Sequence, residues 1–351
     1  MSLERDRAAC AAFLPQVSRT FALSIEALPP RLREPVRVAY LLCRIVDTIE
    51  DEPRVPQPER RLRFDTFDAL LMEDAADPAQ LEQLFRNPQP DDPEAMLCSQ
   101  AGAVFRCFRA LPEPARQAVR PHVLDMSLGM RMYTRRAAAH GGLQLRDMPD
   151  LDRYCYYVAG TVGELLTDLF EQELPSLPPA QRQAVHDLAA DFGQGLQLVN
   201  ILKDVAGDME RGVVYMPQSL LDRHELQPRQ LLEPSRRESS LALIREVSAQ
   251  ARHNLERAKL YVRQWPLPHG EPIRLFCSVP LLLALATLNE LEASDATLRP
   301  GQTPKISRAT LGGLLQRALE AAGNDSALAA LLDMPLGASG TADGRRRRSA
   351  N

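Results

Sequence analysis

The chain has 351 residues, of which 45% are hydrophobic and 25% charged, a composition typical of a globular protein with a sizeable core. Its net charge of -4 argues against a nucleic-acid partner, because nucleic-acid-binding domains are usually strongly basic. The six cysteines show no CxxC and no metal-finger spacing. We therefore expect a reduced cytoplasmic protein, at most peripheral to the inner face of the membrane.

Most of the sequence has helical periodicity, interrupted by breaks that contain proline. Alternating apolar and polar positions, typical of strands, are essentially absent, so we predict an all-α fold. Helices are expected over residues 36–50, 153–170, 181–208, 239–265 and 278–293, with breaks at 29–30, 53–58, 88–93, 175–179, 266–272 and 300–304. The longest apolar run, residues 279–288, is shorter than the ~20 residues that span a bilayer.

No stretch resembles an interdomain linker before about Met334. We therefore predict one domain, residues 1–336, arranged as a helical bundle around a central cavity. Residues 337–351 are small, polar and basic, ending with Arg345 to Arg348, and are predicted to form a disordered tail. Contact of these arginines with anionic lipid or nucleic acid is the alternative interpretation.

A first acidic cluster lies in the predicted helix 36–50 and its continuation. Asp47, Glu50 and Asp51 share one helix face, and Tyr40 and Arg44 continue the same stripe toward the N-terminus. The neighbouring positions are apolar, so the helix is expected to be largely buried. An acidic helix face with no function is the alternative for any single cluster of this kind.

A second polar stripe lies at the end of the predicted helix 181–208. Gln197, Asn200, Asp204 and Asp208 follow the spacing i, i+3, i+7, i+11, again among apolar neighbours. Two such stripes, each on an apolar helix, are harder to explain by chance than one.

Clustered carboxylates on apolar helices are costly unless a cation compensates them, because like charges repel and burial strengthens the repulsion. Oxygen ligands suit Mg²⁺, with Mn²⁺ as an alternative, and Mg²⁺ completes its shell with water and phosphate. The chemistry that fits is ionisation of an allylic diphosphate, with the leaving diphosphate neutralised and the carbocation sheltered by apolar helix walls.

The sequence resembles the squalene/phytoene synthase family, and most closely its squalene synthase branch. The resemblance runs from about Phe13 to Leu332. Five motifs occur in the family's order: SRTF at 18–21, YLLCRIVDTIED at 40–51, YCYYVAGTVG at 154–163, QLVNILKD at 197–204 followed by Asp208 and RGVVYMP at 211–217, and FCSVP at 276–280 with KISR at 305–308.

This resemblance implies a head-to-head prenyltransferase with two half-reactions. Two farnesyl diphosphates would condense to presqualene diphosphate, which NADPH would then reduce to squalene. No GxGxxG follows a predicted strand, so NADPH is not expected to bind in Rossmann fashion. A monomer or weak dimer is expected.

The resemblance also implies roles for the site residues. Metal ligands are expected to be Asp47, Glu50, Asp51, Asp204 and Asp208. Tyr154 is the candidate phenol for proton loss or cation stabilisation, with Arg44 and Tyr40 beside it in the catalytic set. The predicted substrate-binding residues are Ser18, Arg19, Phe21, Gln197, Asn200, Lys203 and Phe276.

Several of these roles have structural alternatives. Arg44 could simply form a salt bridge with the neighbouring carboxylates, and Tyr154, Phe21 and Phe276 could be packing residues. Gly163, like Gly160, either makes room for a prenyl chain or permits a close helix crossing.

Two departures from the squalene synthase pattern leave the product open. Gly207 stands where squalene synthases usually have Glu, and the segment 211–217 is nearer the R-x-Y-x-P pattern of phytoene-type enzymes. The alternatives are a phytoene or dehydrosqualene synthase without reductant, a head-to-tail prenyltransferase or terpene cyclase, and a non-catalytic subunit that binds prenyl diphosphate.

Overall fold

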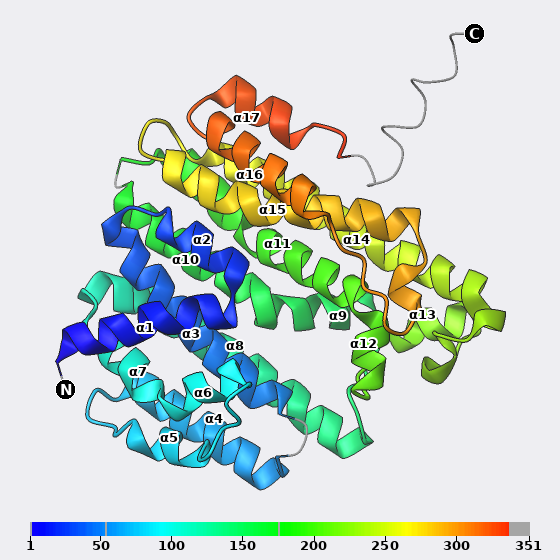
Figure 1. Cartoon of the computed structure of the whole chain (residues 1–351), viewed down its shortest axis with the longest axis horizontal. Helices are drawn as coiled ribbons and strands as arrows, with labels where there is room; N and C mark the ends of the chain where they lie inside the picture. The colour runs from blue at the N-terminus through cyan, green and yellow to red at the C-terminus, as the bar shows by residue number, and fades with distance from the viewer. Residues whose placement is uncertain (1, 53–54, 175, 337–351) are drawn as a thin grey trace. The chain divides into compact units, whose positions relative to one another are not determined.

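The computed structural model describes residues 2–52, 55–174 and 176–336, with the side chains of Arg19 and Thr20 excepted. Every regular element in these ranges is a helix, and they contain no strand, which confirms the all-α prediction (Figure 1). The chain divides into two compact units, a first unit of residues 1–141 and 156–190 and a second unit of residues 142–155 and 191–351. Whether residues 1–336 fold as one domain stays a prediction, and the tail from residue 337 lies outside the described residues.

The first unit is built around α3 (Pro30–Asp51), which packs against α7 (Ala101–Ala110), α8 (Glu113–His140) and α10 (Thr161–Glu173). Proline at the first position of α3 leaves no backbone donor unsatisfied there and fixes the φ angle that a helix needs. The other helices of this unit are α1 (Leu3–Val17), α2 (Arg19–Glu26), α4 (Gln57–Met72), α5 (Ala79–Leu84) and α6 (Pro93–Ser99).

The prediction of a single helix over residues 153–170 is wrong in one respect, because a π-helical turn interrupts that segment. The structure has α9 (Met148–Cys155), then the π turn η1 (Tyr156–Gly160), then α10. Within the first unit, a Cβ on Gly163 would lie 2.0 Å from the carbonyl oxygen of Ala189. Gly163 therefore permits the close approach of α10 to α11 (Pro179–Lys203), one of the two roles considered for it.

The helix predicted over residues 181–208 is also interrupted. Helix α11, which begins in the first unit and enters the second at residue 191, ends at Lys203, and α12 (Val205–Glu210) follows after a break at Asp204. Asp204 has φ -117° and ψ 24°, outside helical geometry. Two hydrogen bonds nevertheless keep the i, i+4 relationship through the break, from Asp204 N to the Asn200 carbonyl at 3.2 Å and from Asp208 N to the Asp204 carbonyl at 2.8 Å.

The second unit is centred on two long helices in contact, α14 (Arg237–Gln264) and α15 (Glu271–Ala293) (Figure 1). Helix α15 starts seven residues before the predicted 278–293, with Pro280 inside it. It is long and apolar enough to cross a membrane, but 72% of its most apolar stretch is buried, as in the core helix of a globular domain. The remaining elements are α13 (Gln218–Arg223), α16 (Arg308–Ala321), α17 (Asp325–Leu332) and the short 3-10 turns η2 (Pro228–Gln230), η3 (Pro234–Arg236) and η4 (Ala296–Leu298).

Candidate active site

The first carboxylate cluster lies on the last three turns of α3, in the first unit. One guanidinium nitrogen of Arg44 donates to Asp47 Oδ2 at 2.6 Å, and the other donates to the Tyr40 hydroxyl at 3.0 Å. The structure therefore brings these three predicted residues together through side-chain contacts. The salt bridge considered for Arg44 exists, and it compensates a carboxylate that would otherwise be isolated on a buried helix.

The pKa of Asp47 depends on its burial and on its arginine partner. Burial raises the pKa of Asp47, although the Arg44 guanidinium opposes the shift. Glu50, one turn further along, is half-buried, and Asp51 is exposed at the end of α3. The cluster thus grades from a paired inner carboxylate to an exposed outer one, which suits a site that ligands enter from the end of the helix.

Helix α2 lies beside this cluster. The ring centroids of Phe21 and Tyr40 are 5.6 Å apart, so Phe21 packs against the stripe as predicted residues of one site would. Ser18 has a structural task, because its hydroxyl accepts a hydrogen bond from the backbone N–H of Phe21 at 3.2 Å and caps α2. The side chain of Arg19 lies outside the described residues, and its predicted role is untested.

The second carboxylate cluster lies in the second unit, where α11 breaks. Asp208 on α12 is 7% exposed, and Arg211 pairs with it and lies 3.6 Å from Asp204. Burial raises the pKa of Asp208 to about 6, with Arg211 opposing and Asp204 adding to the shift. Burial thus outweighs the compensation from Arg211, and a cation bound at this carboxylate would favour its charged form.

Gly207 has a steric role in this cluster. A Cβ at position 207 would lie 2.5 Å from Asp204 Oδ1, closer than real Cβ atoms approach oxygen. Squalene synthases usually have Glu at this position. The absence of a side chain at Gly207 leaves the space that the Asp204 carboxylate occupies.

The amides of the second stripe lie upstream of the break, on α11. Gln197 is half-buried and Asn200 is exposed. The ammonium of Lys203 donates to Asn200 Oδ1 at 3.5 Å, a contact at the outer limit of hydrogen bonding. The Lys203 ammonium at the donor end of that weak contact remains available to an anionic ligand.

Tyr154 is buried, 3% exposed, and its hydroxyl lies 3.4 Å from that of Tyr215 with the ring centroids 5.3 Å apart. Tyr215 also lines, with Asp208, a small cavity of about 10 Å³. The segment after the second cluster therefore joins the carboxylates to the candidate phenol within one unit.

Sequence reasoning assigned no role to Tyr215 or Arg211. The signal that could have found them is the motif segment RGVVYMP at 211–217, whose arginine and tyrosine are the residues that contact Asp208 and Tyr154. Phe276 is 2% exposed in the core of the second unit, and its predicted contact with substrate is untested.

The donors fit Mg²⁺ only in company with a phosphate ligand. Among the residues that the structure describes, no group of three or more His, Cys, Asp or Glu side chains is arranged to hold a metal ion by itself. Mg²⁺ in diphosphate sites commonly takes one or two carboxylates and fills its octahedron with water and phosphate oxygens. The half-buried Asp47 and the buried Asp208, each paired with one arginine, meet that requirement.

A model of the squalene/phytoene synthase family matches residues 14–310. The squalene synthase of Schizosaccharomyces pombe is 27% identical over 307 residues, which cover 85% of this chain and 63% of the relative. The rat squalene synthase is 25% identical over 287 residues, which cover 82% of this chain and 64% of the relative. The chain thus spans less than two thirds of the length of these relatives.

Solved structures share the fold. A ligand complex of TcSQS superposes with a TM-score of 0.75 at 20% identity, covering 93% of this chain and 89% of that one. A dehydrosqualene synthase in complex with a ligand gives a TM-score of 0.64 at 23% identity, covering 91% and 96%. With its family match over most of its length, its all-helical fold and its two arginine-paired carboxylate clusters, this chain belongs to the squalene/phytoene synthase family.

Proposed function

We propose that this protein condenses two farnesyl diphosphates head to head into presqualene diphosphate and reduces that product to squalene with NADPH. The observation that carries the proposal is the pair of arginine-compensated carboxylate clusters at Asp47 and Asp208. The squalene synthase relatives, at 25% and 27% identity, support this choice within the family.

The carboxylates Asp47, Glu50, Asp51, Asp204 and Asp208 would hold Mg²⁺. When bound, the metal supplies a Lewis acid that neutralises the departing diphosphate. Arg44 and Arg211 hold the carboxylates while no ligand is present. Because guanidinium matches phosphate oxygens as well as it matches carboxylates, the exposed Arg211 can turn to the diphosphate when it arrives.

The phenol pair would act on the hydrocarbon part of the reaction. Tyr215 holds the Tyr154 hydroxyl in one place by a hydrogen bond and by ring contact. A fixed phenol oxygen can accept a hydrogen bond or a proton without the reorganisation that water would require. Its burial also keeps water from the carbocation, which water would otherwise capture.

The decisive experiment incubates purified protein with farnesyl diphosphate and Mg²⁺, with and without NADPH, and identifies the extracted products by mass spectrometry. We expect presqualene diphosphate without NADPH and squalene with it. An Asp204→Asn variant run in parallel controls for contaminating enzymes. Release of no diphosphate by the wild type would contradict the prenyltransferase proposal.

The second candidate is a dehydrosqualene or phytoene synthase that needs no reductant. It is favoured by the segment 211–217, which is nearer to the phytoene-type pattern, and by the structural likeness to a dehydrosqualene synthase. A desaturated product, formed at a rate that NADPH does not change, would select this candidate and reject the reductive one.

A further inference from the structure

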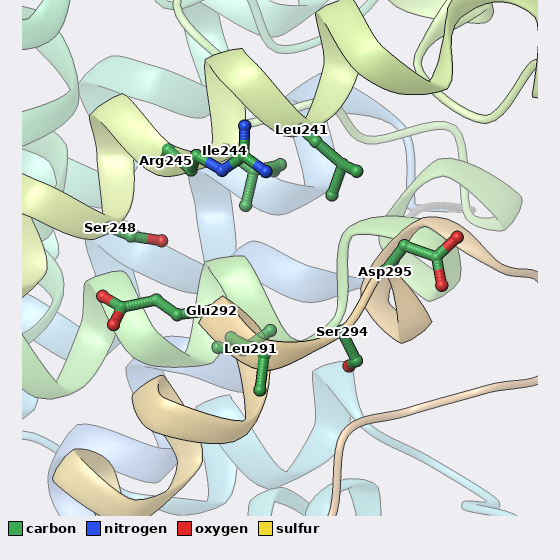
Figure 2. A pocket seen from close by; sticks show the side chains of 9 residues that line it. Leu241, Ile244, Arg245, Ser248, Leu291, Glu292, Ser294 and Asp295 are labelled. Atoms are coloured by element: carbon green, nitrogen blue, oxygen red, sulfur yellow. The ribbon is translucent and has the colours of Figure 1, made fainter. Parts of the chain in front are cut away.

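A second cavity lies in the second unit, between α14 and the C-terminal end of α15, where none of the predicted site residues occurs. Its volume is about 210 Å³. Figure 2 shows the side chains around it, from Leu241, Ile244, Arg245 and Ser248 on α14 and from Leu291, Glu292, Ala293, Ser294 and Asp295 on α15 and just after it.

Two hydrogen-bond donors of this cavity have no use within the protein. Ser248 is 3% exposed, and its hydroxyl makes no hydrogen bond to any residue that the structure describes. Arg245 is exposed at the mouth of the cavity and forms no ion pair with the described part of the chain. Both side chains can therefore donate to a ligand that enters the cavity.

The charges around the cavity favour an anion. Glu292 is already paired with Arg252 at 2.6 Å. Asp295 is shared by Arg299 at 2.8 Å and Arg237 at 3.6 Å. Both carboxylates are therefore compensated. Asp295 has two arginines for one negative charge, and Arg245 adds a further positive charge. A ligand with a single negative charge would reduce this surplus, whereas a cation would increase it.

The walls favour an apolar body behind the anionic head. Leu241, Ile244 and Leu291 face the cavity, and Ile244 and Leu291 are 3% and 2% exposed. An engineered apolar cavity of roughly 150 Å³ holds benzene, so 210 Å³ has room for a head group and about six carbon atoms.

We propose that this cavity is a binding site for a small amphipathic anion, a carboxylate or phosphate on a short apolar chain. The head group accepts from Arg245 and from the Ser248 hydroxyl, and the chain contacts Ile244 and Leu291. The proposal concerns residues separate from both carboxylate clusters and stands whether or not the protein makes squalene.

Calorimetric titration of the full chain with hexanoate and with hexyl phosphate, in EDTA, tests the proposal. EDTA keeps Mg²⁺ from recruiting the probes to the carboxylate clusters. We expect saturable binding that Arg245→Met weakens about tenfold, as loss of a charge-assisted hydrogen bond does. Ser248→Ala is expected to weaken it about threefold. The better of the two probes identifies the head group.

The matched control is Arg229→Met, which removes an exposed arginine from η2 and should leave the affinity unchanged. A methyl NMR signal of Ile244 reports location, and it should shift on titration with the same midpoint as the calorimetry. Equal weakening in Arg245→Met and Arg229→Met, saturation without a shift of the Ile244 methyl, or no binding up to ~10 mM would overturn the proposal.

Discussion

The first carboxylate cluster lies in an uninterrupted helix, whereas the second lies where a helix breaks. In the first, Arg44 precedes Asp47 by one turn, and the side chains are 29% and 24% exposed. In the second, Arg211 follows Asp208 by one turn, and the side chains are 61% and 10% exposed. The same charge pairing is thus made once by a half-buried cation on a rigid helix and once by an exposed cation in a turn.

This difference separates two tasks. A half-buried arginine on α3 is held by its helix and by Tyr40, so its removal should disturb the fold. An exposed arginine in the turn before Tyr215 can leave its carboxylate at little cost, so its removal should disturb the reaction more than the fold. The carboxylates themselves should be equally necessary in both clusters.

The largest expected effect is on turnover when either cluster loses a carboxylate. Asp47→Asn and Asp204→Asn should each lower the rate of diphosphate release from farnesyl diphosphate at least ~100-fold, because the charge that would hold the metal is gone. In EDTA, thermal unfolding should occur at a lower temperature for Asp47→Asn, which leaves Arg44 unpaired, and at an unchanged or higher temperature for Asp204→Asn. Glu210→Gln, exposed at the end of α12, is the control. Near-wild-type turnover in either Asn variant would remove the metal-site proposal.

The arginines should differ in stability. Arg44→Gln should lower the free energy of unfolding by about 2 kcal/mol, since it breaks a half-buried ion pair and the contact with Tyr40. Arg211→Gln should lower it by about 1 kcal/mol or less, because the Arg211 side chain is 61% exposed, although Asp208 is only 10% exposed. Urea denaturation of both variants without ligand measures the difference. Similar losses in the two would show that the turn after Asp208 is as rigid as α3.

The buried charge of Asp208 should be visible in the pH dependence of stability. Its pKa of about 6 is above the ordinary Asp value of 3.8, so the folded state binds this proton more tightly than the unfolded state. The stability cost is therefore absent below about pH 4 and complete once the pH has risen through 6, and it should be on the order of 2 kcal/mol. Denaturation between pH 4 and 7 should show this loss in the wild type and not in Asp208→Asn. Parallel curves for the two proteins would contradict the assignment.

The smallest expected effect on stability is that of Gly207→Ala. Alanine gains up to about 1 kcal/mol of helix propensity over glycine, but its Cβ would displace the Asp204 carboxylate. We expect an unchanged or slightly higher unfolding temperature and a turnover several-fold lower. Gly313→Ala on α16, where a Cβ would meet nothing within 4 Å, should raise stability without changing turnover. Full activity in Gly207→Ala would show that the position of Asp204 is not constrained.

The first cluster was predictable from sequence because α3 is continuous, and the 3.6-residue period therefore places Tyr40, Arg44 and Asp47 correctly. The face of the second cluster was also predicted, since two hydrogen bonds carry the i, i+4 relationship across Asp204. The break itself was not, because periodicity counts residues and does not see the dihedral angles of one position. The π turn at 156–160 was not predicted either, since its residues are as apolar as those of a regular helix.

The partners of the site were less predictable than its charges. Arg211 and Tyr215 lie in a turn that has no periodicity, and their contacts with Asp208 and Tyr154 depend on how that turn folds back. The predicted contact of Ser18 with substrate is untested, and the structure adds that Ser18 caps α2, a role for which serine is a preferred residue.

The π turn η1 has a consequence for insertions and deletions. Tyr156 and Tyr157 at its start contact α8, where the Tyr156 hydroxyl is 3.4 Å from Asp125 and the Tyr157 ring occupies the space that a Cβ on Gly129 would need. Gly163, after the turn, must face Ala189. Deleting one residue from 156–160 would turn the π turn into an α turn and rotate α10 by about 100° relative to these tyrosines. A change of length in this turn should therefore be tolerated less well than a substitution that keeps the contacts of Tyr156 and Tyr157.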